Sequence, residues 1–233
     1  MSRQAKQSKV RAVADAGATV LQHGNSLAEA RLEAECVANY QGLTTISPAN
    51  NEDVTFGQGT VMLELIEQVA EMGVADLDAV VLPSGGGSLL AGSAIAAQGT
   101  RIEVFGSEPS AKKMACSNAS SAGDSTTYES NTIADCLRCS VSDMNRDIIK
   151  HKAIVRDTHS APEDDIRKAM ALFINSTKML IEPGSAVPLA IVLFCKGFRE
   201  RFMKGDLRRK VGVVLTGGNI TLEDAYSVTS QQI

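Results

Sequence analysis

The chain has 233 residues, of which 44% are hydrophobic and 21% are charged, and its formal net charge is −4 at pH 7. This balance is ordinary for a globular protein, and the acidic net charge argues against nucleic acid or an anionic membrane as a partner. No apolar stretch reaches the roughly 18 residues that a membrane span needs, and the first residues are too polar for a signal peptide.

The first part of the chain predicts two helices with a short extended segment between them. Ser26 and Glu29 have the spacing of a capping box, which predicts the start of the second helix. The expected elements are a helix over 6–16, a strand over 18–22, a helix from 26 to about 40, and a polar loop over 48–53.

The middle of the chain predicts alternating helices and strands. Apolar residues over 58–72 fit a helix with a broad apolar face. A compact apolar strand over 78–83 leads into the glycine-rich residues 84–88 and another helix, and residues 101–106 form the next strand. Residues 115–131 are rich in Ser, Asn, Ala and Gly, which predicts a surface loop.

The last part continues the same alternation. Pro162 stands in the first turn of a helix that runs to about Lys178, and residues 185–199 form a strongly apolar helix. Residues 210–215 are the last core strand. The strands are apolar without alternation, which is typical of a parallel sheet covered by helices on both faces. We therefore predict an α/β fold with a mainly parallel sheet.

The glycine-rich segment after the strand at 78–83 is the strongest single motif. Glycines allow successive backbone N–H groups to face one anion, and a following helix adds its positive end. The segment has neither the Lys-Ser/Thr of a phosphate-binding Walker loop nor the glycine spacing of a dinucleotide site. The motif alone is compatible with a phosphate-binding loop and with a simple tight turn.

Five cysteines, an odd number at scattered positions, argue against a disulfide framework and predict a reducing, cytoplasmic location. Cys136 and Cys139 have C-x-x-C spacing, which zinc sites and redox pairs share. No second pair or histidine cluster accompanies them, so we interpret them as two ordinary buried thiols.

Several further motifs occur together and in a fixed order. They are Lys-Val-Arg-Ala-Val-Ala-Asp-Ala-Gly-Ala at 9–18, Gly-Gln-Gly-Thr at 57–60, Thr-Ile-Ala-Asp at 132–135, Leu-Ile-Glu-Pro at 180–183 and Leu-Thr-Gly-Gly-Asn at 215–219. With the glycine-rich segment, they make the chain resemble the serine/threonine dehydratase and serine racemase family of pyridoxal-phosphate (PLP) enzymes. The resemblance implies fold type II, similar to the tryptophan synthase β subunit. It also implies that residues 1–49 are the remnant of an incomplete small domain and 50–233 the large PLP-binding domain.

The resemblance also implies site residues. The family's tetraglycine loop, which binds the PLP phosphate, matches Gly85, Gly86, Gly87 and Ser88. Its hydroxyl residue beside the pyridine nitrogen matches Thr216, followed by Gly217, and its active-site glutamate matches Glu182. Cys136 stands where the family has a glycine beside the cofactor, so we expect it to add a side chain near the ring.

Two departures from the family are important. The Schiff-base lysine lies in an S-x-K segment of the family, and no lysine of this sequence lies in such a segment. We therefore expect no covalent PLP binding and no useful activity of this polypeptide alone. The family's divalent-metal site matches Glu108 and the Lys112 carbonyl, but Met114 replaces its aspartate. A thioether is a poor ligand for Mg²⁺ or Ca²⁺, which argues against a metal here.

Three functions remain open from the sequence. The chain is a truncated PLP-dependent lyase or racemase acting on L-serine or L-threonine, a non-catalytic pseudoenzyme that binds or regulates a full-length homologue, or one half of a split enzyme. The expected partners are an amino-acid substrate and either a second copy of the chain or a full-length homologue.

Overall fold

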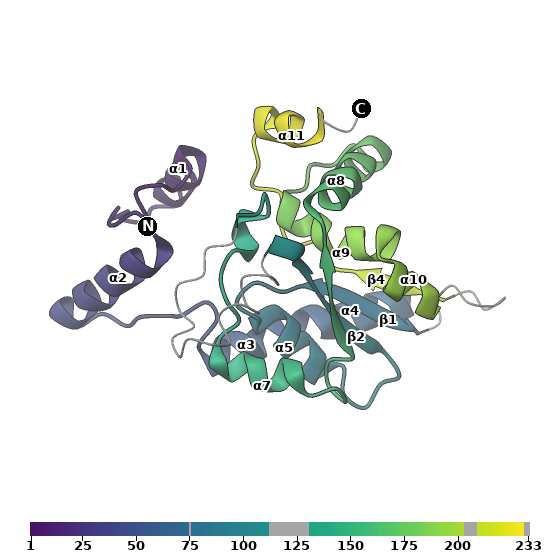
Figure 1. Ribbon diagram of the computed structural model, residues 1–233. Helices are drawn as coiled ribbons and strands as arrows, with labels where there is room; N and C mark the ends of the chain where they lie inside the picture. Colours follow the sequence, from purple (N-terminus) through teal and green to yellow (C-terminus); the bar gives the residue numbers. More distant parts are fainter. Residues whose placement is uncertain (75, 112–130, 203–208, 231–233) are drawn as a thin grey trace. The chain divides into compact units, whose positions relative to one another are not determined.

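The computed structural model describes residues 1–74, 76–111, 131–202 and 209–230 (Figure 1). It contains two compact units, an N-terminal unit, Met1–Ser47, and a C-terminal unit, Pro48–Ile233. The interpretation of residues 1–49 as the remnant of a small domain stays a prediction. Among the described residues, no helix is both long and apolar enough to cross a membrane.

The N-terminal unit contains α1 (Gln7–Asp15) and α2 (Leu27–Gln41). The predicted start of α2 at Ser26 is confirmed, since the Ser26 hydroxyl accepts a hydrogen bond from the Glu29 N–H at 3.1 Å. The Glu29 carboxylate in turn accepts one from the Asn25 N–H at 2.9 Å. The predicted strand over 18–22 is wrong. Residues 18–23 make isolated hydrogen bonds with the first residues of the chain, such as the one that the His23 N–H donates to the Met1 carbonyl at 2.9 Å. A strand needs a continuous ladder with a neighbour, and these isolated bonds do not make one.

The C-terminal unit is built on a four-stranded, fully parallel sheet in the order β3–β2–β1–β4. All five residues of β1 are buried, because this strand lies between β2 and β4 and is covered on both faces. The prediction of a buried strand from the apolar run at 78–83 is therefore confirmed. The strands are β1 (Ala79–Pro83), β2 (Glu103–Pro109), β3 (Asp157–Ala161) and β4 (Val211–Val213).

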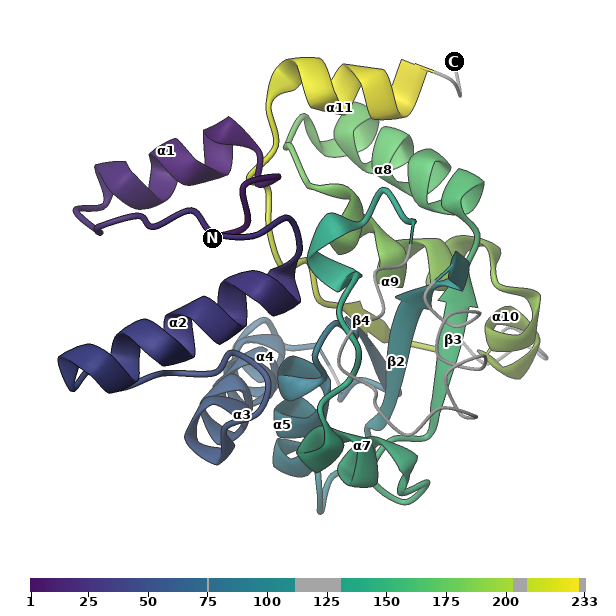
Figure 2. The same ribbon diagram turned by 60° about the vertical axis from the view of Figure 1, so that its left-hand side comes forward.

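Helices cover both faces of this sheet (Figure 1, Figure 2). Successive strand residues point to opposite faces, so Val81 joins one hydrophobic core and Val80 and Leu82 join the other. The first core is shared with α8 (Glu163–Thr177), α9 (Pro183–Phe194) and α10 (Lys196–Phe202), and the second with α4 (Thr60–Glu71) and α5 (Ser88–Ala96). The predicted α/β class, with a parallel sheet between helices, is confirmed.

The remaining elements refine the sequence prediction. The helix expected over 58–72 is α4, which begins just after Gly59. A separate helix, α3 (Glu52–Gln58), precedes it and takes up the end of the loop expected over 48–53. A β-carbon on Gly59 would lie 2.9 Å from the Gly92 carbonyl oxygen, so glycine is required for the close approach to α5. The helix expected over 185–199 begins at Pro183 and divides at Cys195. The loop predicted over 115–131 lies outside the described residues except for its last residue. The other helical elements are η1 (Asp135–Leu137), α7 (Asp143–Lys150) and α11 (Leu222–Thr229).

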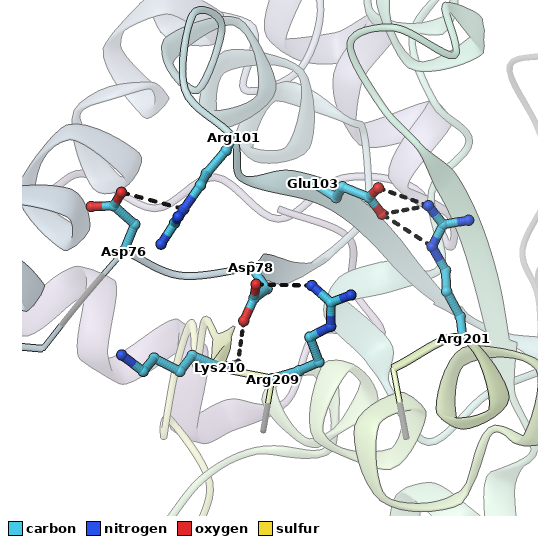
Figure 3. A network of polar contacts seen from close by, with 7 residues as sticks. All are labelled: Asp76, Asp78, Arg101, Glu103, Arg201, Arg209 and Lys210. Atoms are coloured by element: carbon cyan, nitrogen blue, oxygen red, sulfur yellow. Dashed lines mark hydrogen bonds and ion pairs between the residues drawn. The ribbon is translucent and has the colours of Figure 1, made fainter. Parts of the chain in front are cut away.

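Charged residues tie the strands together at the amino-terminal edge of the sheet (Figure 3). The Asp78 carboxylate accepts a hydrogen bond from the Lys210 N–H at 2.7 Å and one from Arg209 at 3.2 Å, which joins β1 to β4. The backbone N–H of Lys210 is the main reason that the pKa of Asp78 lies below its usual value, and Arg209 adds to the effect. The Glu103 carboxylate meets Arg201 of α10 at 2.7 Å.

Candidate functional site

Two motif-bearing loops lie at the carboxyl-terminal edge of the sheet. β1 leads directly into the glycine loop, which we define as residues 85–88, and β4 leads into residues 216–219. The Val214 N–H donates to the Val81 carbonyl at 3.1 Å, so the pairing of these two chains continues just past the end of β4. In parallel α/β sheets, ligands bind at the carboxyl ends of the strands. The candidate site is therefore built here.

The glycine loop needs its glycines. Gly87 has φ of 93°, and a β-carbon on it would lie 2.9 Å from Val141 Cγ1 and 3.0 Å from Asn145 Cβ. A β-carbon on Gly86 would overlap the side chain of Ala49. Side chains are thus excluded on the inner side of the loop, where α7 and the residues before α3 pack closely.

The backbone of the glycine loop offers donors for an anion. Among the described residues, none accepts a hydrogen bond from the N–H groups of Gly86, Gly87 or Ser88. Ser88 is also the first residue of the nine-residue helix α5, whose N-terminus carries a partial positive charge. Backbone N–H groups and a helix N-terminus together form a site for a phosphate or another anion.

Cys136 lies between the glycine loop and the start of α9. A β-carbon on Gly85 would lie 3.2 Å from the Cys136 carbonyl oxygen, and one on Gly184 would overlap the Cys136 sulfur. The interpretation of two ordinary buried thiols is wrong for Cys136, which is exposed, while Cys139 is half-buried. The short helix η1 presents Cys136 at the edge of the site, so the sulfur is not covered by the core.

Glu182 and Gly217 meet on the other side of Cys136. The Glu182 N–H donates to the Gly217 carbonyl at 3.0 Å, and a β-carbon on Gly217 would lie 2.9 Å from Glu182 Oε1. The Glu182 side chain is half-buried, and Thr216 is exposed. The residues predicted for the site from four separate segments are thus gathered at one edge of the sheet.

Ser185 is a residue of this region that the sequence did not point out. It is fully buried in the first turn of α9, and its hydroxyl oxygen accepts hydrogen bonds from the N–H groups of Gly217 at 2.7 Å and Thr216 at 3.1 Å. The same hydroxyl donates to the Gly217 carbonyl at 2.7 Å. A serine within an apolar helical run is the only local signal for it, because its partners lie about thirty residues away in the sequence.

Glu108 lies near the end of β2, opposite Ser160 of β3, and is half-buried. Lys112 and Met114, the other two positions of the predicted metal site, lie outside the described residues. Within the part of the chain that the structure describes, no group of three or more His, Cys, Asp or Glu side chains could hold a metal ion. That Glu108 holds no metal therefore stays a prediction.

The fold and the site define a class of protein: a parallel α/β protein whose glycine loop, at the carboxyl edge of the sheet, offers backbone N–H groups to an anion. The family model for pyridoxal-phosphate dependent enzymes matches residues 1–217. The chain belongs to this family.

The relatives include three enzymes of the kind that the sequence resembles. The chain is 34% identical to serine racemase of Dictyostelium discoideum in an alignment 238 residues long, which covers 94% of this chain and 65% of that protein. It is 31% identical to the catabolic L-threonine dehydratase of Escherichia coli in an alignment 236 residues long, which covers 98% of this chain and 67% of that protein. A serine racemase of Arabidopsis thaliana is 34% identical, with 78% of this chain and 53% of that protein covered.

Solved structures show the same fold. The structure of serine racemase from Dictyostelium discoideum matches with a TM-score of 0.77 and covers 95% of this chain and 68% of that chain. Maize serine racemase matches with a TM-score of 0.81 at 28% identity and covers 99% of this chain and 68% of that one. The chain thus spans about half to two thirds of the length of these relatives.

Proposed function

We propose that this chain provides the PLP site of a serine racemase or of a serine/threonine dehydratase. The observation that carries the proposal is the set of backbone N–H groups of Gly86, Gly87 and Ser88, which have no acceptor among the described residues and lie at the N-terminus of α5. They fit a phosphate monoester, since each N–H can donate to a phosphate oxygen and the helix end favours its charge.

The residues around the glycine loop fit the rest of the cofactor. Gly85, Gly86, Gly87 and Ser88 would hold the phosphate. The exposed hydroxyl of Thr216 would donate to the pyridine nitrogen, and Gly217 and Cys136 would border the ring. A neutral hydroxyl partner, unlike an aspartate, leaves that nitrogen largely unprotonated.

Bound PLP supplies an electron sink that stabilises negative charge on the α-carbon of an amino acid. The chain's own contribution is to bind and orient. The half-buried Glu182 carboxylate lies beside Gly217, where Oε1 can accept a proton or a hydrogen bond. Ser185 fixes Thr216 and Gly217 to the first turn of α9 through its buried hydroxyl, so the two segments move together.

The second part of the proposal concerns activity. The substrate class, serine or threonine, is taken from the relatives. No lysine of this sequence lies in a segment like the family's S-x-K, so we propose that this polypeptide alone neither deaminates nor racemises these amino acids. Its partner is then a second copy of the chain, or a full-length homologue that would supply the amine or be regulated by this chain.

The binding proposal is tested with two ligands that differ only in the phosphate. Pyridoxine 5′-phosphate should bind the wild-type chain at least about tenfold more tightly than pyridoxine, because only the first reaches the N–H groups of the glycine loop. Isothermal titration calorimetry gives both dissociation constants. Equal affinities for the two ligands would contradict the assignment of residues 85–88.

Two substitutions of Ser88 separate the effect of a negative charge on phosphate binding from the effect of a larger side chain. Ser88→Asp places a carboxylate at the first residue of α5, where it favours the helix but repels the phosphate. We expect about a tenfold loss of affinity for pyridoxine 5′-phosphate and no change for pyridoxine. Ser88→Asn, which has the same shape without the charge, is the matched control and should keep most of the phosphate preference.

A further inference from the structure

Asn145 of α7 is fully buried directly behind the glycine loop. Its amide oxygen accepts a hydrogen bond from the Thr55 hydroxyl at 3.1 Å. Its amide nitrogen donates to the Ala49 carbonyl at 2.8 Å and to the Gly86 carbonyl at 3.2 Å. Both donors and the acceptor of this side chain are therefore used, which is the condition for burying an amide without a large cost.

The Gly86 carbonyl is held by two donors, since the Ser142 N–H also donates to it at 3.1 Å. A trans peptide is planar, and the N–H of a residue points opposite to the carbonyl before it. When the Gly86 carbonyl faces α7, the Gly87 N–H must face away from α7. This N–H is one of those without an acceptor among the described residues.

We propose that Asn145 is a positioning residue for the phosphate of the ligand, an inference that rests on the proposed function. By fixing the Gly86 carbonyl, Asn145 turns the Gly87 N–H toward the phosphate and keeps the glycine loop from rotating this peptide. The ligand class is a phosphate monoester, and Asn145 acts on it only through the backbone. Ser142 and Thr55 complete the support, the first through Gly86 and the second through the Asn145 amide oxygen.

Asn145→Asp is the sharpest test, because aspartate has the same shape. The carboxylate still accepts from Thr55, but it cannot donate, and its charge faces the carbonyls of Ala49 and Gly86. The Gly86–Gly87 peptide then loses one of its two anchors. We expect the preference for pyridoxine 5′-phosphate over pyridoxine to fall about tenfold, with little change for pyridoxine. Asn175→Asp in α8 adds the same charge elsewhere and should leave the preference unchanged.

Asn145→Ser removes the two hydrogen bonds that the Asn145 amide donates, without adding a charge. It replaces Asn145→Asp as the test if the aspartate variant does not fold. It should lower the phosphate preference by about threefold to tenfold. A spectroscopic readout separates positioning from general support. In the wild-type chain, adding pyridoxine 5′-phosphate should shift the Gly87 amide proton downfield in the nuclear magnetic resonance spectrum. Either Asn145 variant should weaken that shift.

The outcomes distinguish the two proposals. A wild-type phosphate preference that persists in folded Asn145 variants, with the Gly87 shift intact, overturns the role of Asn145 and leaves the proposed function standing. A wild-type chain without any phosphate preference overturns the proposed function and the role of Asn145 with it. A preference that falls in the Asn145 variants and not in Asn175→Asp supports both.

Discussion

The sulfur of Cys136 fills the space beside the α-carbon of Gly184, so that a β-carbon on Gly184 would overlap it. The two residues come from η1 and from the first turn of α9, and they share one small volume at the edge of the candidate site. A cysteine is tolerated where the family resemblance places a glycine because Gly184 leaves room for its sulfur.

This relationship predicts a compensating pair. Gly184→Ala alone should destabilise the chain by about 1 kcal/mol, since the new methyl group must displace the Cys136 sulfur, which can turn toward solvent. Cys136→Gly together with Gly184→Ala should recover most of that loss. Urea denaturation of the wild type, both single variants and the double variant gives the coupling free energy.

Gly197 provides a control for the pair. It lies in α10, and a β-carbon there would meet nothing within 4 Å. Gly197→Ala should therefore be neutral or stabilise the helix slightly. If the Cys136 and Gly184 substitutions prove additive, the shared volume does not exist in solution.

A second prediction concerns pH and the amino-terminal edge of the sheet. The pKa of Asp78 is lowered in the folded chain, chiefly by the Lys210 N–H. Its stabilising effect is therefore present above the unfolded pKa of about 3.9 and is lost as the pH falls through the lower, folded value. The stability difference between the wild type and Asp78→Asn should be constant near neutral pH and shrink below about pH 4.

Thermal unfolding of both proteins between pH 7 and pH 2 measures this difference. Asp76→Asn is the comparison, because within the described part of the chain the Asp76 side chain makes only an exposed ion pair with Arg101, at 3.3 Å (Figure 3). Exposed pairs contribute little, so its removal should matter little at any pH. A difference for Asp78 that does not change with pH would show that its carboxylate is not the source of the effect.

The sequence predicted some of these features and not others for physical reasons. The apolar run at 78–83 predicted the buried strand β1. The sequence of β3, Asp-Thr-His-Ser-Ala, has no such pattern, so this strand was not predicted. The resemblance placed the glycine loop, Glu182 and Thr216 together. Asn145 was missed because its partners lie 59 to 96 positions away, and local patterns do not encode such contacts.

A third prediction concerns metal binding near Glu108. With a methionine at position 114, millimolar Mg²⁺ or Ca²⁺ should change the melting temperature little, because a thioether does not replace a carboxylate. Met114→Asp should restore an oxygen ligand and produce a metal-dependent increase. Saturation at 100 times the dissociation constant would add about 2.7 kcal/mol to the free energy of unfolding, which is easily measured. An increase of that size in the wild type would show that other oxygen ligands complete the site.

The last prediction compares two fully buried serines. Ser185→Ala removes a hydroxyl that accepts hydrogen bonds from the N–H groups of Thr216 and Gly217 and donates one to the Gly217 carbonyl. The stranded backbone groups should lower the free energy of unfolding by about 1–3 kcal/mol. Since Thr216 and Gly217 border the ring rather than the phosphate in our proposal, affinity should fall by a similar factor for pyridoxine and for pyridoxine 5′-phosphate.

Ser93 of α5 is the matched control, because its hydroxyl is equally buried but has no hydrogen-bond partner among the residues that the structure describes. Ser93→Ala removes an unsatisfied group and should be neutral or stabilising. Chemical denaturation and calorimetry with the two ligands measure both effects. Ser185→Ala acts on the ring side of the site and Ser88→Asp on the phosphate side, so the two variants should alter ligand affinity in different ways. A selective loss of phosphate affinity in Ser185→Ala would mean that residues 216 and 217 contact the phosphate, and the ring would then have to lie elsewhere.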